Sequence, residues 1–177
     1  MIIRPRRLRR TSTIRAMVRE TSISAGDFDI RRVDRLNLGL GLLVFFLSFI
    51  VYMMTVQRTF SFWDCGEFVA CSYILGVPHP PGAPLFVLIG RIFSLIPFST
   101  DIGFRINILS VVSTALASMF GYFAIVKLVR EWFGEKVEGL RQVGMYTGAV
   151  IGALLMSFST TNWNSAVEAE VYGPSML

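Results

Sequence analysis

The feature that most constrains this chain is a run of 21 residues without a charged side chain, from Leu36 to Val56. A helix of about 20 apolar residues matches the thickness of a bilayer's hydrocarbon core. The composition agrees, because 53% of the 177 residues are hydrophobic and 13% are aromatic. We therefore expect an all-α integral membrane protein.

The positive charge is concentrated before this run. Ten of the 17 Lys and Arg residues lie within residues 1–35, together with four acidic residues. Basic residues before a span mark the cytoplasmic side, so the net charge of +5 does not indicate a nucleic-acid partner. We expect a disordered cytoplasmic tail at residues 1–35 and a membrane domain at residues 36–177. Two alternatives for residues 1–26 remain open: a mitochondrial transit peptide, or an upstream start codon with the true start at Met17.

Two further apolar runs predict membrane spans, at residues 106–128 and 143–160. The apolar run at residues 83–98 has only 16 residues and carries Arg91 in its middle. Without a crossing by this run, 14 cations lie inside and three outside. A crossing would move four of them outside, against the positive-inside bias. We therefore expect three spans in total, with an interfacial helix at residues 83–98 on the outer face.

Polar residues suited to chemistry follow the first span, on the expected outer face. Asp64 and Glu67 are three residues apart, which places both carboxylates on one face of a short helix. Ser61 has the spacing of a cap for this helix. His79, the only histidine of the chain, lies in a turn among prolines.

A second acidic pair, Glu168 and Glu170, follows the third span. The three-span topology places it on the same face as Asp64, so we expect Asp64 and at least one member of the pair to face a common cavity. Glycines at every fourth position from Gly144 to Gly152 predict close helix packing that would help to bring the span ends together. Neighbouring carboxylates raise one another's pKa, which suits an acid–base role.

The sequence contains no Gly-rich phosphate loop, Ser-His-Asp order or zinc-ligand spacing. A carboxylate at a membrane face can act as a general base on a hydroxyl group. Arg91 or Arg105 could hold the phosphate of a lipid-linked donor. These are the parts needed to transfer a sugar from a polyprenyl-phosphate carrier. The residues predict no metal site and leave a requirement for a divalent metal open.

Three motifs carry a resemblance to a known family: FWDCGEF at residues 62–68, GVPHPPGAPL at residues 76–85 and AVEAEVY at residues 166–172. They resemble the domain of unknown function 2723 family, which includes the transmembrane protein 260 type of protein O-mannosyltransferase. That family is similar in turn to the GT-C class of glycosyltransferases. The resemblance covers roughly residues 32–177.

The resemblance implies a GT-C-like N-terminal module whose catalytic residues are Asp64, as the base, and Glu67 beside it. Substrate or donor binding is expected of five residues: His79, Arg91, Arg105, Glu168 and Glu170. The expected partners are membrane lipid, a polyprenyl-phosphate-linked sugar and a hydroxyl acceptor such as a protein Ser or Thr. The site would lie on the outer, periplasmic or luminal, face of a multi-pass membrane protein. Because GT-C proteins have more spans, we expect an N-terminal fragment that is inactive alone.

Two other functions remain as alternatives: a transporter or channel subunit, and a non-catalytic membrane scaffold. Charged residues of a transporter usually lie within the spans and line a path. The acids of this chain lie between the predicted spans, which favours the transferase.

Overall fold

The computed structural model describes residues 35–59, 61, 63–80, 82–134, 137 and 139–176. All regular secondary structure within these residues is helical, as the sequence predicts. The predicted basic tail, the transit-peptide alternative and Met17 lie outside the described residues.

Two helices are long and apolar enough to cross a membrane, α2 (Arg35–Thr55) and α5 (Ile102–Phe133). α2 has 21 residues and matches the first predicted span. α5 has 32 residues and extends the predicted span 106–128 at both ends. The earlier start has a local cause, because the Asp101 carboxylate caps the helix by accepting a hydrogen bond from the Phe104 N–H at 3.1 Å. At about 1.5 Å per residue, α5 is roughly 48 Å long and exceeds the ~30 Å hydrocarbon core.

The third predicted span, residues 143–160, corresponds to α6 (Leu140–Ser157), and a further helix, α7 (Thr160–Val167), follows it after a bend of 62°. The described chain thus has two candidate spans, or three if the bent pair is one broken span. Two side chains bind the last turn of α6: the Ser159 hydroxyl and the Asn162 amide both donate to the Met156 carbonyl, at 2.8 and 2.7 Å. Such bonds compete with the helical pattern, so the chain turns instead of continuing straight.

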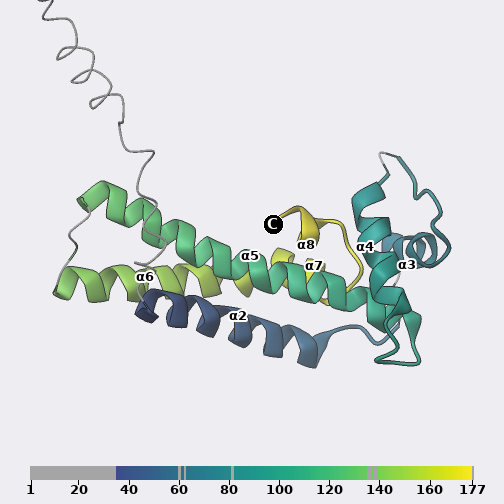
Figure 1. Ribbon diagram of the computed structural model, residues 1–177, viewed down its shortest axis with the longest axis horizontal. Coiled ribbons are helices and arrows are strands. Elements are labelled where there is room, and N and C mark those ends of the chain that lie inside the picture. The colour runs from purple at the N-terminus through teal and green to yellow at the C-terminus, as the bar shows by residue number, and fades with distance from the viewer. Residues whose placement is uncertain are drawn as a thin grey trace, which may run out of the picture. The chain divides into compact units, whose positions relative to one another are not determined.

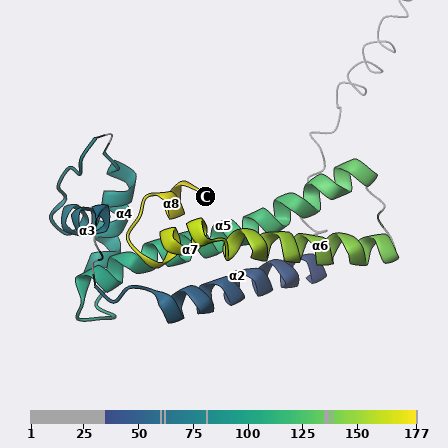
Figure 2. The same ribbon diagram turned by 180° about the vertical axis from the view of Figure 1, so that it is seen from behind.

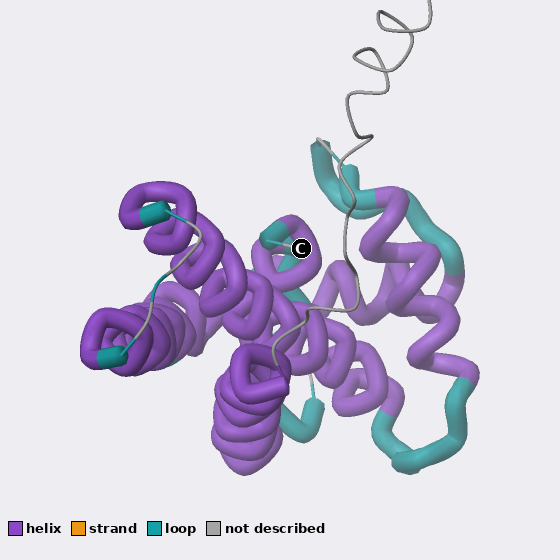
Figure 3. The backbone as a smooth tube through the Cα atoms, turned by 60° about the vertical axis from the view of Figure 1, so that its left-hand side comes forward, coloured by secondary structure: helices purple, strands orange, loops and turns teal. Residues whose placement is uncertain are grey.

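Three helices, α2, α5 and α6, lie side by side (Figure 1 and, from behind, Figure 2). Two shorter helices, α3 (Asp64–Ile74) and α4 (Pro84–Leu95), pack together where α2 ends and α5 begins. α4 runs across the bundle instead of along it, as Figure 1 shows, and Figure 3 shows the described elements as helices joined by loops. The interfacial placement of residues 83–98 stays a prediction. The short α8 (Tyr172–Ser175) packs on α5.

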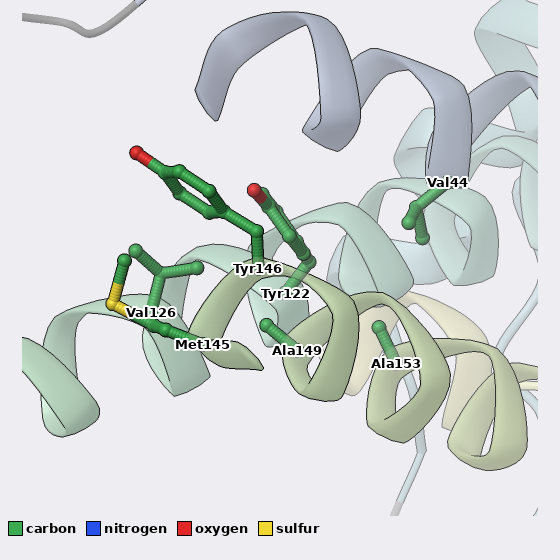
Figure 4. Packing of buried hydrophobic residues seen from close by; sticks show 7 residues of the cluster. All are labelled: Val44, Tyr122, Val126, Met145, Tyr146, Ala149 and Ala153. Carbon is green, nitrogen blue, oxygen red and sulfur yellow. The ribbon is translucent and has the colours of Figure 1, made fainter. Parts of the chain in front are cut away.

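The three long helices share a buried core, drawn in Figure 4: Val44, Tyr122, Val126, Met145, Tyr146, Ala149 and Ala153. Small side chains on α6 allow close approach of its neighbours. Hydrogen bonds join α2 to the end of α6, because the Tyr52 hydroxyl donates to the Ser157 carbonyl at 2.6 Å and the Ser157 hydroxyl donates to Ser48 at 2.8 Å. Polar groups that are satisfied within the protein suit a lipid environment.

The glycine row of α6 packs closely at one of its three positions only. A Cβ atom on Gly152 would lie 3.2 Å from the Ile125 side chain. On Gly144 and Gly148 it would meet nothing within 4 Å among the described residues. The predicted packing is wrong at these two positions, because the neighbouring small residue that turns into the core is Ala149.

Candidate functional site

Glu67, in the first helical turn of α3, binds the loop residue His79. Glu67 accepts two hydrogen bonds from His79, one from the backbone N–H to Oε1 and one with ring atom Nδ1 to Oε2, both 2.7 Å long. The other ring nitrogen, Nε2, lies 3.8 Å from Oδ2 of Asp64. The predicted helical face with both carboxylates is therefore confirmed, and His79 lies against it.

These contacts change the protonation of both partners. The hydrogen bond with Glu67 raises the pKa of His79 above 6.5 against the opposing effect of desolvation, and the charges of Glu67, Asp64 and Glu170 add to the rise. The hydrogen bonds from His79 in turn lower the pKa of Glu67 below 4.5. The pair thus favours an imidazolium and a carboxylate over neutral groups.

Ser61 has a different partner from the one predicted. The residue before α3 is Trp63, with φ of 68°, and no side chain caps the helix. The Ser61 hydroxyl donates instead to Oε2 of Glu168. The prediction that Ser61 caps α3 is wrong. The fold brings the Glu168 carboxylate close to Ser61, and the Ser61 hydroxyl binds this carboxylate instead of the helix.

The second acidic segment also reaches the site from the other end of the chain. Figure 1 shows the stretch between α7 and α8 extending toward α4. Burial raises the pKa of the half-buried Glu170 above 4.5, and the charges of Glu168 and Asp64 raise it further. The Val171 N–H and the charge of His79 oppose this rise. The hydrogen bond from Ser61 joins this segment to the residues that precede α3, and a common cavity for Asp64 and the Glu168–Glu170 pair stays a prediction.

Asn107 is a polar residue of this region that sequence reasoning missed. It lies in α5, is fully buried, and donates from its amide to the carbonyls of Gln57 at 2.8 Å and Thr59 at 2.9 Å. Its Oδ1 accepts from the Cys65 thiol at 3.9 Å. An amide near the start of an otherwise apolar helix was the available signal, since buried polar groups need partners.

The two arginines have bonding partners within the protein. Arg91 donates from Nη1 to the Tyr73 carbonyl, and its guanidinium lies 5.4 Å from the centre of the Tyr73 ring. Arg105 donates from Nη1 to the Ser94 carbonyl at 2.8 Å, and from Nε and Nη2 to the Ser99 carbonyl. Arg105 therefore braces the connection between α4 and α5. Phosphate binding by either arginine stays a prediction.

Three side chains of the site also meet a geometric condition for a metal ion. One potential ligand atom from each of Asp64, Glu67 and His79 lies within 4.8 Å of the other two. Two carboxylates and an imidazole form a mixed oxygen and nitrogen set that divalent cations accept. A cation here would compete with the proton on His79, because metal ligands must be deprotonated.

Comparison with known proteins gives a consistent family. Residues 64–177 match the family model described as the protein O-mannosyl-transferase TMEM260 N-terminal domain. The chain is 29% identical over 128 residues to the mouse protein O-mannosyl-transferase TMEM260, covering 72% of this chain and 16% of that protein. It is 31% identical over 133 residues to a Dictyostelium discoideum protein of the same name, covering 73% of this chain and 14% of the relative.

The chain therefore spans about one sixth of the curated relatives that it matches. No solved structure matches it. The family match includes the acids of α3, the His79 turn and the Glu168–Glu170 segment, so it confirms the resemblance drawn from those motifs. This chain belongs to the family of the protein O-mannosyl-transferase TMEM260 N-terminal domain.

Proposed function

We propose that this chain forms the site-bearing N-terminal part of a membrane glycosyltransferase. The enzyme would move a sugar from a polyprenyl-phosphate donor to a hydroxyl acceptor, with protein Ser or Thr as the acceptor class. The observation that carries the proposal is the hydrogen bond from Ser61 to Glu168, which joins the second acidic segment to the residues just before Asp64. The names of the relatives, protein O-mannosyl-transferases, support the reaction class and a sugar donor.

In this proposal, Asp64 is the general base and Glu67 is its supporting neighbour. Both oxygens of Glu67 are occupied by hydrogen bonds from His79. The Asp64 side chain is 55% exposed, and its nearest ring nitrogen is 3.8 Å away. Asp64 is therefore the carboxylate better placed to accept a proton from an acceptor hydroxyl, because such transfer needs an accessible oxygen within hydrogen-bond reach.

Arg91 is the better candidate for the donor phosphate of the two predicted arginines. Its described side-chain hydrogen bond uses one nitrogen, Nη1. Arg105 uses all three guanidinium nitrogens on backbone carbonyls. Because a guanidinium binds phosphate best through two parallel N–H groups, Arg91 retains more of the required donors. A transporter or channel is less well supported, since the acids of the site lie outside the candidate spans.

The test is Asp64→Asn in the natural full-length protein, assayed for sugar transfer from a polyprenyl-phosphate donor. We expect transfer to fall by about 10²–10⁴-fold, because the substitution removes the proton acceptor and keeps the shape. The matched control is Asp101→Asn, which makes the same change in the cap of α5, where Asn caps a helix as well as Asp does. Near-normal transfer by Asp64→Asn, with correct membrane insertion, would exclude Asp64 as the base.

A further inference from the structure

One face of α5 binds both segments that carry the acidic residues. On the first segment, the Asn107 amide donates to the carbonyls of Gln57 and Thr59, in the connection between α2 and α3. Its oxygen accepts from Cys65, the residue directly after Asp64. Asn107 thus binds the chain on both sides of Asp64.

The second segment is bound to the same face one helical turn further along. Ser110 lies three residues after Asn107, a spacing that places both on one side of a helix. The buried Ser110 hydroxyl accepts from the Glu170 N–H and donates to the Glu170 carbonyl, both at 3.3 Å. The Gln57 N–H also donates to the Val167 carbonyl at 2.8 Å, beside Glu168.

Asn107 is the residue on which this arrangement depends most. It has no exposed surface, and the two carbonyls that it binds belong to a connection outside any helix, where helical hydrogen bonds are not available to satisfy them. An apolar residue of similar size would leave both carbonyls without this amide partner. The connection would then be free to shift, and Asp64 would move with it.

We propose that Asn107 is a positioning residue that holds Asp64 at a fixed distance from the Glu168–Glu170 segment. The expected effect of Asn107 on catalysis rests on the transferase function proposed above. The expected effect of Asn107 on the distance between the two segments does not. Fixed separation matters chemically, because misplacing a reacting group by about 1 Å can cost roughly 100-fold in rate. It also matters electrically, since the charges around Glu170 are those of Glu168, Asp64 and His79.

The test is Asn107→Leu in the natural full-length protein. The matched control is Asn37→Leu, which makes the same change in α2 at a residue that accepts a hydrogen bond from the Tyr122 hydroxyl at 2.9 Å. Spin labels are attached through a ketone-bearing amino acid at two exposed positions, Trp63 and Tyr172. Pulsed electron paramagnetic resonance then measures the distance between the two segments.

We expect one narrow distance distribution in the parent protein and in Asn37→Leu, and a broader or displaced one in Asn107→Leu. If Asn107→Leu does not fold, Ser110→Ala replaces it in the test. Ser110→Ala removes a single hydroxyl group, the one that binds the Glu170 backbone. We expect the same broadening of the distance distribution. Unchanged distances in Asn107→Leu, or in Ser110→Ala where only that variant folds, would overturn the inference.

Catalysis gives the second readout. We expect kcat of Asn107→Leu to fall by about 100-fold with little change in KM. Asn37→Leu should keep the kcat of the parent protein. Absence of transfer by the parent protein would overturn the proposed function alone, and the distances would still decide the inference.

Discussion

At the scale of single residues, the pairing of Glu67 with His79 sets the charge of the site. The pKa of His79 is raised, so its stabilising contribution is complete below 6.5 and is lost as pH rises through the raised value. The pKa of Glu67 is lowered, so its contribution is complete above 4.5 and is lost as pH falls through the lowered value. Both contributions are therefore complete between pH 4.5 and 6.5.

This pairing predicts the titration of His79. We expect nuclear magnetic resonance of the labelled imidazole to give a pKa above 6.5, and Glu67→Gln to lower it, because the substitution removes the charge and the strongest acceptor. The chain has one histidine, so an untagged 177-residue protein gives one imidazole signal. Glu131→Gln, a change that leaves the hydrogen bonds of His79 in place, should leave the titration unchanged. An unaltered pKa in Glu67→Gln would contradict the pairing.

The individual site residues show where sequence reasoning succeeds and where it stops. The common face of Asp64 and Glu67 follows from helical spacing alone and is confirmed. The partner of Ser61 does not, because Glu168 lies 107 residues away along the chain and only the fold brings it near. Asn107 was missed for a similar reason: its carbonyl partners belong to a connection whose path depends on tertiary packing.

At the scale of elements, the contact between α3 and α4 depends on a glycine. A Cβ atom on Gly90 of α4 would lie 2.5 Å from Oγ and 2.9 Å from Cβ of Ser72 on α3. The Cβ atom of Ser72 cannot move without its backbone. The two helices would therefore have to separate, and α3 carries the acids of the site.

We predict that Gly90→Ala lowers the free energy of unfolding relative to Gly148→Ala. Both changes bring the same gain in helix propensity, but Gly148 has open space where the new methyl group would lie. The difference between them isolates overpacking, which typically costs about 1–3 kcal/mol. Thermal unfolding of the two variants in the same detergent measures it. Equal stability of the pair would show that α3 and α4 adjust without cost.

A helix boundary could be predicted where neighbouring residues in the sequence determine it. α2 follows from an uninterrupted apolar run, and its observed ends agree with the prediction within a residue. Helix α7, which follows the third predicted span after a bend, was not predicted, because the turn before it involves side-chain bonds from Ser159 and Asn162 to one carbonyl. Hydropathy averaged over a span does not register such bonds.

At the scale of the membrane domain, Asp64 and Glu67 lie at one end of the helical bundle, in α3. α4 lies at that end too, and the end of α5 and the start of α6 lie at the other (Figure 1). We predict that a reporter inserted within residues 131–139 is cytoplasmic and that one inserted after residue 98 is external, because this assignment places most cations inside. Enzymatic reporters active on one side only provide the measurement. The reverse pattern would move the site to the cytoplasmic face.

The hydrogen bond between Ser61 and Glu168 has a consequence for biosynthesis. Its two residues are 107 positions apart in the chain. At about 5–20 residues per second, Glu168 is translated roughly 5–20 s after Ser61. Throughout that interval, this hydrogen bond cannot form. This contact between the two acidic segments therefore forms only after α7 has been made.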